Sequence, residues 1–133
     1  MREFHLKIVT PDGLVFDGSA ESILVRAESG DVEIMGGHTD YFATLGTGRA
    51  KLESGSVTRE AATSGGFISV KDGEVKLVCT TFEFADQIDV ARAEAARERA
   101  EEAIKRAQSD SELAIASAKL KRALSRISVA KSR

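Results

Sequence analysis

The sequence is poor in the residues that mark secreted, membrane-spanning or metal-binding proteins. Its 133 residues include one cysteine, one proline, two histidines and no tryptophan. One cysteine, Cys79, cannot form an internal disulfide, and too few histidines remain for a zinc or histidine metal site. There is neither a long apolar run nor a basic-then-apolar leader. We therefore expect a cytoplasmic protein without a structural metal.

The common signatures of catalysis are also missing. No Gly-x-x-x-x-Gly-Lys-Ser/Thr phosphate loop occurs in the chain, and no nucleophile elbow places serine, histidine and aspartate together. The sequence therefore predicts a protein that is not an enzyme and has no catalytic residues.

Glycine and proline divide the chain into two parts. All 11 glycines lie between Gly13 and Gly73, the only proline is Pro11, and the last 60 residues contain neither. Because these residues punctuate turns, the first part should consist of short, reversing segments and the second of long, uninterrupted ones. Two domains are predicted, over residues 1–84 and 85–133.

The first part alternates as β-strands do. Phe4, Leu6 and Ile8 share one face of a strand, and a Pro-Asp-Gly turn follows at residues 11–13. Asp72-Gly73 separates two alternating segments, which predicts a tight hairpin and puts Cys79 on a buried face. Eight to ten short strands without helices between them indicate a sandwich or flattened barrel. The stretch of residues 35–48 is expected to be an exposed loop.

The second part predicts two helices. The first should begin with Asp86 as N-cap and run to about Ala107, and Asp110 or Ser111 should cap the second. Leu113, Leu120 and Ile127 recur every seven residues, with Ala116, Ala123 and Leu124 in the same apolar stripe. The apolar face expected for the first helix is mostly alanine: Ile88, Ala91, Ala95, Ala103 and Ile104. Since alanine buries little apolar area, the hairpin should be weakly held and able to detach.

Charge is distributed unevenly along the chain. Residues 1–84 carry 8 basic and 13 acidic residues, whereas residues 85–133 carry 11 basic and 8 acidic ones. From Leu113 onward the charged residues are all basic: Lys119, Lys121, Arg122, Arg126, Lys131 and Arg133. This C-terminal segment is suited to an acidic partner or a phosphate.

Arginines at helical spacing should meet across the hairpin. If the helices fold back antiparallel near Asp110, Arg92 lies near Arg126 and Arg99 lies near Arg122. Four converging guanidinium groups favour a bound polyanion. The alternative is that they are solvated and pair with neighbouring glutamates, namely Glu94, Glu98, Glu101 and Glu102. Nucleic acid is less favoured because the basic face lacks interleaved aromatic residues.

Several strings resemble one family along the whole chain. "FHLKIVTPDGLVFDGSAESILVRAESGDVEIMGGHTDYFATL" and "SGGFISVKDGEVKLVC" resemble the N-terminal signature and last hairpin of the epsilon subunit of bacterial and chloroplast F-type ATP synthases. The family commonly has Pro-Gly-His where this chain has Gly36-Gly37-His38. The resemblance implies an all-β plus α fold, with a ten-stranded flattened β-sandwich followed by an antiparallel two-helix hairpin.

The same resemblance implies a rotor subunit. The sandwich would bind the gamma subunit and the membrane c-ring, with contacts around Asp31 and His38. The hairpin would regulate ATP hydrolysis. When extended, it would reach the alpha/beta catalytic head, where its basic residues would contact the beta subunit and inhibit hydrolysis. These basic residues are Lys119, Lys121, Arg122 and Arg126. The subunit would be peripheral, at the cytoplasmic face of the bacterial plasma membrane or the stromal thylakoid face.

A nucleotide motif of the family is complete here, as Ile88-Asp89-Val90-Ala91-Arg92-Ala93. The resemblance implies that ATP, without required Mg²⁺, holds the hairpin folded down. The implied ATP-site residues are Glu83, Ile88, Asp89, Arg92, Ala93, Arg99, Arg122 and Arg126. A free-standing nucleotide-sensing or nucleic-acid-binding protein with a basic hairpin remains the alternative.

Overall fold

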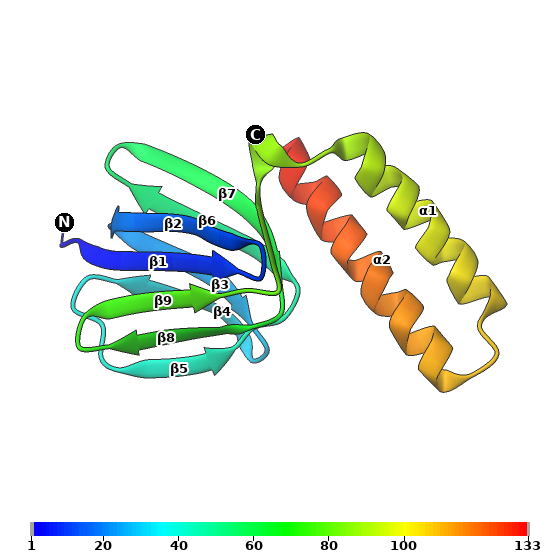
Figure 1. The fold of residues 1–133 in the computed structure, drawn as a ribbon, viewed down its shortest axis with the longest axis horizontal. Helices are drawn as coiled ribbons and strands as arrows, with labels where there is room; N and C mark the ends of the chain where they lie inside the picture. The colour runs from blue at the N-terminus through cyan, green and yellow to red at the C-terminus, as the bar shows by residue number, and fades with distance from the viewer. Residues whose placement is uncertain (1, 133) are drawn as a thin grey trace.

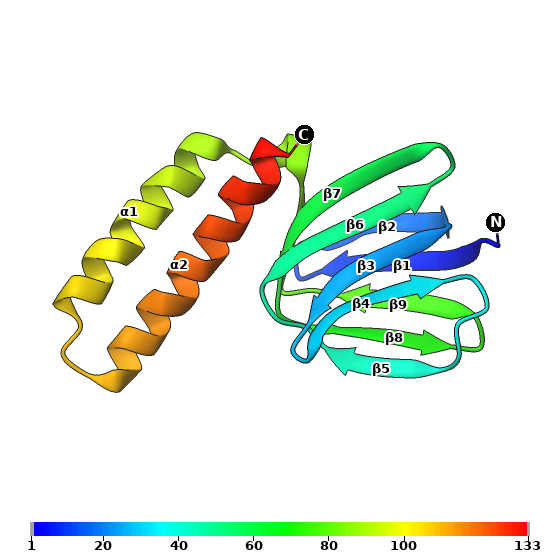
Figure 2. The same ribbon diagram turned by 180° about the vertical axis from the view of Figure 1, so that it is seen from behind.

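Ten β-strands in two sheets precede two helices in this computed structural model, which describes residues 2–132 (Figures 1 and 2). One sheet has the order β2 (Gly13–Ala20), β1 (Phe4–Thr10), β9 (Glu74–Val78), β8 (Phe67–Lys71) and β5 (Tyr41–Thr44). The other has the order β10 (Thr81–Phe84), β7 (Val57–Ser64), β6 (Gly48–Ser54), β3 (Ser22–Ala27) and β4 (Gly30–Met35). The predicted β-sandwich followed by a helical hairpin is confirmed. Arg133, in the predicted basic segment, lies outside the described residues.

The strand pairing follows the turn chemistry. β8 and β9 form the predicted antiparallel hairpin, and Asp72 and Gly73 take positive φ values of 51° and 81° in its turn. β1 pairs with β2 across the Pro-Asp-Gly turn and lies parallel to β9 on its other side. This parallel pairing joins the β1–β2 hairpin to the β8–β9 hairpin in one sheet. The paired residues are distant in sequence, so no local pattern predicts the pairing.

The core lies between the two sheets. Leu6, Ile8, Ile23, Ile34 and Leu77 are fully buried there. Cys79 joins them at 1% exposure, and burial raises the pKa of its thiol to about 12. The thiol is therefore protonated and packs as a small apolar side chain.

The stretch expected to be a loop contains a short strand. β5 pairs antiparallel with β8 at the edge of the first sheet, and Phe42 on it is 62% exposed. Phe42 stacks on Phe67 of β8 with ring centroids 5.3 Å apart. Four residues between glycine-rich segments are too few to show an alternation, so only the pairing partner reveals this strand.

Both helices begin at other residues than the sequence predicts. The chain first makes a short 3₁₀ turn, η1 (Ala85–Gln87), and α1 (Val90–Arg106) starts after Asp89, whose carboxylate accepts a hydrogen bond from the Arg92 backbone at 3.0 Å. The predicted N-cap Asp86 is therefore wrong. α2 (Asp110–Lys131) is capped by Ser109 rather than by Asp110 or Ser111. Ala85 and Ile88 are buried, and Ile88 and Asp89 keep an extended backbone, so α1 starts only after Asp89.

The apolar stripes predicted for the hairpin are only partly confirmed: Ala116, Ala123 and Ile127 of α2 are buried as expected, but Ala91 and Ala103 of α1 are exposed. Ala93 and Ala100 of α1 are buried instead. Leu113 and Leu124 are 43% and 48% exposed. Alanines occur all around α1, so spacing alone cannot select its inner face. Moreover, α2 has two neighbours: it lies between α1 and the sandwich (Figures 1 and 2), and it contacts β7, β6 and η1 as well as α1.

No helix within residues 2–132 has the length and hydropathy needed to cross a bilayer.

Candidate functional site

A crevice of about 370 Å³ opens where the hairpin meets the sandwich. The β1–β2 turn and β10 form its sandwich side, and the two helices form the other. Its lining residues are Thr10, Asp12, Thr80, Thr81, Phe82, Glu83, Ile88, Asp89, Arg92, Ala96, Arg99 and Arg126. The crevice is lined by residues of both domains.

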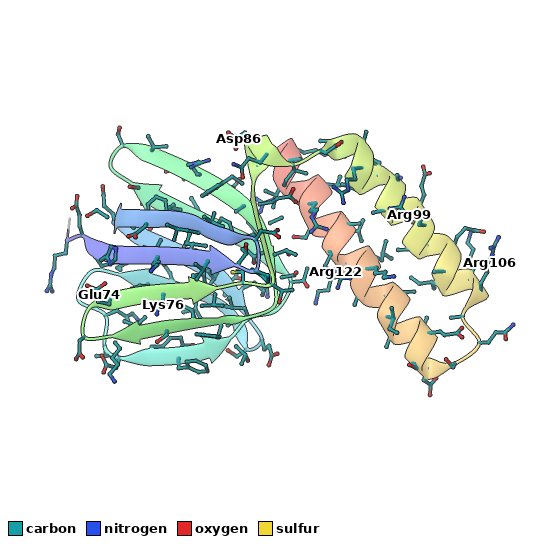
Figure 3. All side chains as sticks on the ribbon, viewed as in Figure 1. Glu74, Lys76, Asp86, Arg99, Arg106 and Arg122 are labelled. Carbon is teal, nitrogen blue, oxygen red and sulfur yellow. The ribbon has the colours of Figure 1, made fainter. Side chains whose placement is uncertain are left out.

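Three of the four predicted arginines line the crevice. Arg92 and Arg99 come from α1, and Arg126 comes from α2. Within residues 2–132, neither Arg92 nor Arg99 has a carboxylate within ion-pair distance. Figure 3 marks Arg99 on α1 and Arg122 on α2. Arg122 lines a much smaller neighbouring cavity that it shares with Arg126.

Arg126 differs from the other arginines because it already has a partner. Its Nε donates to Glu83 Oε1 at 2.9 Å, which links α2 to β10. The two side chains are 29% and 39% exposed. The expected cluster of uncompensated guanidinium groups is thus partly compensated in the structure.

The other members of the predicted ATP motif have structural roles. Ile88 lines the crevice, is 5% exposed, and belongs to a second small core with Ala62, Ala85, Val129 and Ala130. The Asp89 carboxylate caps α1. Ala93 is 4% exposed and lies outside the lining of the crevice. Whether these residues bind ATP stays a prediction.

The hairpin is fastened to the sandwich near its C-terminal end. Arg49 donates to the Ser128 hydroxyl at 3.0 Å, and Ser132 donates to Glu60 at 2.5 Å. One turn earlier, Ser125 donates to the Gly48 carbonyl at 3.2 Å. Together with the second small core, these contacts confine the attachment to the end of α2 nearest the hinge.

A hydroxyl group on β7 lacks a partner. Thr63 is 3% exposed, and its Oγ1 is buried without a hydrogen bond within residues 2–132. It lines the small cavity shared by Arg122 and Arg126. Beside it, Ser64 and Thr81 bond to each other at 2.6 Å. The interface between helix and sheet is therefore partly polar rather than a continuous apolar seam.

Two of the four residues expected to contact the beta subunit are exposed on α2, whereas Arg122 and Arg126 face the sandwich. Lys119 and Lys121 are exposed, and Lys119 borders a groove of about 700 Å³ between the two helices. Arg97 pairs with Glu94 at 2.8 Å and with Glu101 at 3.4 Å. Glutamate pairing, the alternative considered for the four arginines, therefore occurs at this fifth one.

Asp31 and His38 do not form one loop. Asp31 is the second residue of β4, and the rest of that strand lies between it and His38. Asp31 pairs with Arg26 across the β3–β4 hairpin at 3.1 Å. His38 follows the other end of β4 and meets the Tyr41 ring edge-on at 5.8 Å. They mark two separate regions of the sandwich surface.

Sequence reasoning missed the far wall of the crevice. Thr10 ends β1 and Asp12 lies in the β1–β2 turn, both far from the helical motif in sequence, and Thr80 precedes β10. Their sequence signal is that of a tight turn only. No group of three or more histidine, cysteine or carboxylate residues suited to a metal occurs within residues 2–132.

Two family models match the chain in succession. The ATP synthase delta/epsilon chain β-sandwich domain matches residues 3–85, and the long α-helix domain of the same chain matches residues 86–131. The chain belongs to the ATP synthase delta/epsilon chain family. The resemblance inferred from the sequence is thereby confirmed.

Relatives and solved structures agree with this family. The ATP synthase epsilon chains of Bacillus velezensis and Ruminococcus albus are both 40% identical to the chain, over 98% of each sequence. That of Bacillus subtilis is 42% identical over 85% of this chain and 86% of its own. A chain of the Euglena gracilis mitochondrial ATP synthase, in a structure of its OSCP/F1/c-ring part, has the same fold, with a TM-score of 0.78 at 20% identity over 90% of this chain and 76% of that one.

Proposed function

We propose that the chain is a non-catalytic subunit of the central rotor stalk of an F-type ATP synthase. The match along nearly the whole chain carries this proposal, since relatives of the same length match both domains. The sandwich binds the gamma subunit and the c-ring, and the hairpin reaches the alpha/beta catalytic head. The free-standing nucleotide-sensing or nucleic-acid-binding alternative is not favoured.

The subunit acts at the cytoplasmic face of the bacterial plasma membrane, or at the stromal thylakoid face in a chloroplast, and is held there through the complex. The bacterial relatives at 40% identity support the first location. Co-purification tests the assembly: a tagged full-length chain expressed in its source cells should carry the gamma subunit with it. A tagged chain recovered without gamma would contradict the rotor assignment.

The hairpin inhibits ATP hydrolysis when it leaves the sandwich. The confined attachment at the end of α2 supports this, because few contacts need to break. The 22 residues of α2 span about 33 Å, so extension carries Lys119 and Lys121 far from the sandwich. Undocking also separates Arg126 from Glu83 and makes it available to an acidic segment of the beta subunit. Truncation after Phe84 should preserve assembly and relieve inhibition.

ATP, without required Mg²⁺, stabilises the docked hairpin by binding in the crevice. Arg92 and Arg99 hold phosphate oxygens there, with Arg122 and Arg126 beside them. Glu83 and Asp89 accept hydrogen bonds from the adenine or ribose. A ligand of the docked state stabilises it by about 1.4 kcal/mol at ten times its Kd, which is a tenfold shift in population.

Calorimetry of the full-length chain tests the ATP site. Wild type should release heat with ATP, and Arg92→Ala should weaken binding about tenfold or more, since a charged hydrogen bond to phosphate is lost. Arg97→Ala is the matched control, because Arg97 lies on the same helix outside the crevice. Absence of heat at millimolar ATP would contradict the nucleotide site. It would not affect the rotor assignment, which co-purification with gamma tests separately.

A further inference from the structure

The crevice carries as many carboxylates as arginines. Arg92, Arg99 and Arg126 face it together with Asp12, Glu83 and Asp89. Their formal charges cancel, so a ligand with several negative charges does not enter a strongly positive site. Rearrangement of an ion pair already present would add to the attraction that Arg92 and Arg99, unpaired within residues 2–132, exert on a polyphosphate.

The three carboxylates are not equivalent. Asp89 already serves α1 as its N-cap. Asp12 has no ion pair with any residue of the described range 2–132. Glu83 is the one of the three that pairs with a guanidinium group of these arginines, at 2.9 Å. It is the carboxylate whose negative charge directly opposes a phosphate at Arg126.

We propose that Glu83 is an internal competitor for Arg126, a role that rests on the proposed nucleotide site. In the ligand-free protein its carboxylate occupies the guanidinium that a phosphate oxygen takes when a polyphosphate binds. A guanidinium group pairs with carboxylate and with phosphate through the same planar arrangement of N–H donors, so the two acceptors exchange at one donor. This differs from the nucleoside contact proposed above for Glu83.

The competition also bears on hairpin docking. Glu83 lies on β10 and Arg126 on α2, so their pair bridges the sandwich and the hairpin without any ligand. When a polyphosphate takes Arg126, the bridge passes from Glu83 to the ligand. Glu83 therefore raises the docked population at low ligand concentration and reduces the gain that ligand adds, which sets the concentration at which the hairpin responds.

Glu83→Gln in the full-length chain separates the two roles. Glutamine keeps the size of the side chain and can accept a nucleoside hydrogen bond, but it loses the charge. We expect calorimetry to show about fivefold tighter binding of inorganic tripolyphosphate, because a half-exposed opposing charge is removed. ATP binding should tighten in the same direction. Without ligand, amide exchange in residues 110–131 should become faster.

Glu60→Gln is the matched control. Glu60 also bonds to α2, through Ser132, but it lies outside the crevice. This variant should loosen the hairpin without tightening tripolyphosphate binding.

Each outcome decides a different point. Weaker ATP binding by Glu83→Gln, with tripolyphosphate binding unchanged, would assign Glu83 to the nucleoside and overturn the competitor role. Equal affinities of wild type and Glu83→Gln for both ligands would overturn it as well. Absence of heat with both ligands in both proteins would overturn the nucleotide site together with the competitor, and gamma co-purification would still stand as the separate test of the rotor assignment.

Discussion

Val129→Ala should release the hairpin while leaving the sandwich folded. Val129 is 1% exposed and belongs to the second small core, where it packs with Ile88, Ala62 and Ala85 across the boundary between the two domains. The side chain lies on the hairpin and its neighbours lie on the sandwich and the hinge. The free energy lost on truncation therefore falls on docking rather than on the main core.

The magnitude follows from the two methyl groups removed. At about 0.8 kcal/mol per group the transfer free energy is ~1.6 kcal/mol, and a residual cavity brings the total to about 2 kcal/mol. Since 1.36 kcal/mol corresponds to a factor of ten, the undocked population should rise about 30-fold. Hydrogen exchange followed by mass spectrometry should show faster exchange in residues 110–131 and unchanged exchange in β1 and β9.

Leu124→Ala is the control for this experiment. It removes more apolar atoms from the same helix, but Leu124 is 48% exposed. It should leave exchange nearly unchanged, within the small range typical of surface substitutions. Equal acceleration by both variants, or none by Val129→Ala, would refute the view that the second small core holds the hairpin down.

Two further predictions concern the sandwich. Thr63→Val should raise the Tm by roughly 3 to 5 °C, because a buried unpaired hydroxyl group that costs about 1 kcal/mol or more is replaced by a methyl group of the same shape. Thermal unfolding measures this, with Thr63→Ser, which keeps the hydroxyl group, as the control. A lower Tm for the valine variant than for wild type would contradict the prediction. The second prediction concerns His5, which lies between Asp17 and Glu74 with both contacts at 2.5 Å. The hydrogen bond to Asp17, and to a smaller extent the one to Glu74, raises the pKa of His5 above 6.5. Because the folded-state pKa is the higher one, this contribution to stability is complete below the unfolded pKa and is lost as pH rises through the folded pKa. In urea titrations from pH 5.5 to 9, wild type should therefore exceed His5→Gln most at low pH, and a difference that grows with pH would argue against the contact.

The contacts of the hairpin explain how one chain carries both a stable part and a movable one. The main core between the sheets contains large aliphatic side chains such as Leu6 and Ile68. The boundary between the domains contains small residues, hydroxyl groups and two ion-paired arginines, Arg49 and Arg126. Partly exposed polar contacts contribute little net free energy, so the docked and released states can lie close together. The proposed ligand of the crevice would then need little binding free energy to shift their populations.

Local chemistry in the sequence determined the class of the protein. Glycines confined to residues 13–73 and a helix-rich remainder separate a β-domain from a helical one. The Asp72-Gly73 turn identifies the β8–β9 hairpin, since few other dipeptides accept two positive φ angles. The helical spacing of Arg92, Arg99 and Arg126 places them on facing surfaces of a hairpin, and all three do line one crevice. These features depend on residues that are close together in the sequence, within one turn, helix or strand, so the sequence alone predicts them.

Only the tertiary structure decided which neighbours those surfaces meet. Asp89 rather than Asp86 caps α1 because burial of Ala85 and Ile88 delays the helix, and burial is a property of the whole fold. Leu113 and Leu124 are exposed because the alanines of α1 and the strand β7 approach other faces of α2. Asp12 enters the crevice, and Glu83 reaches Arg126, through pairings of residues distant in sequence. Such contacts are selected by packing and charge among many competing partners, and no local pattern in the chain encodes that selection.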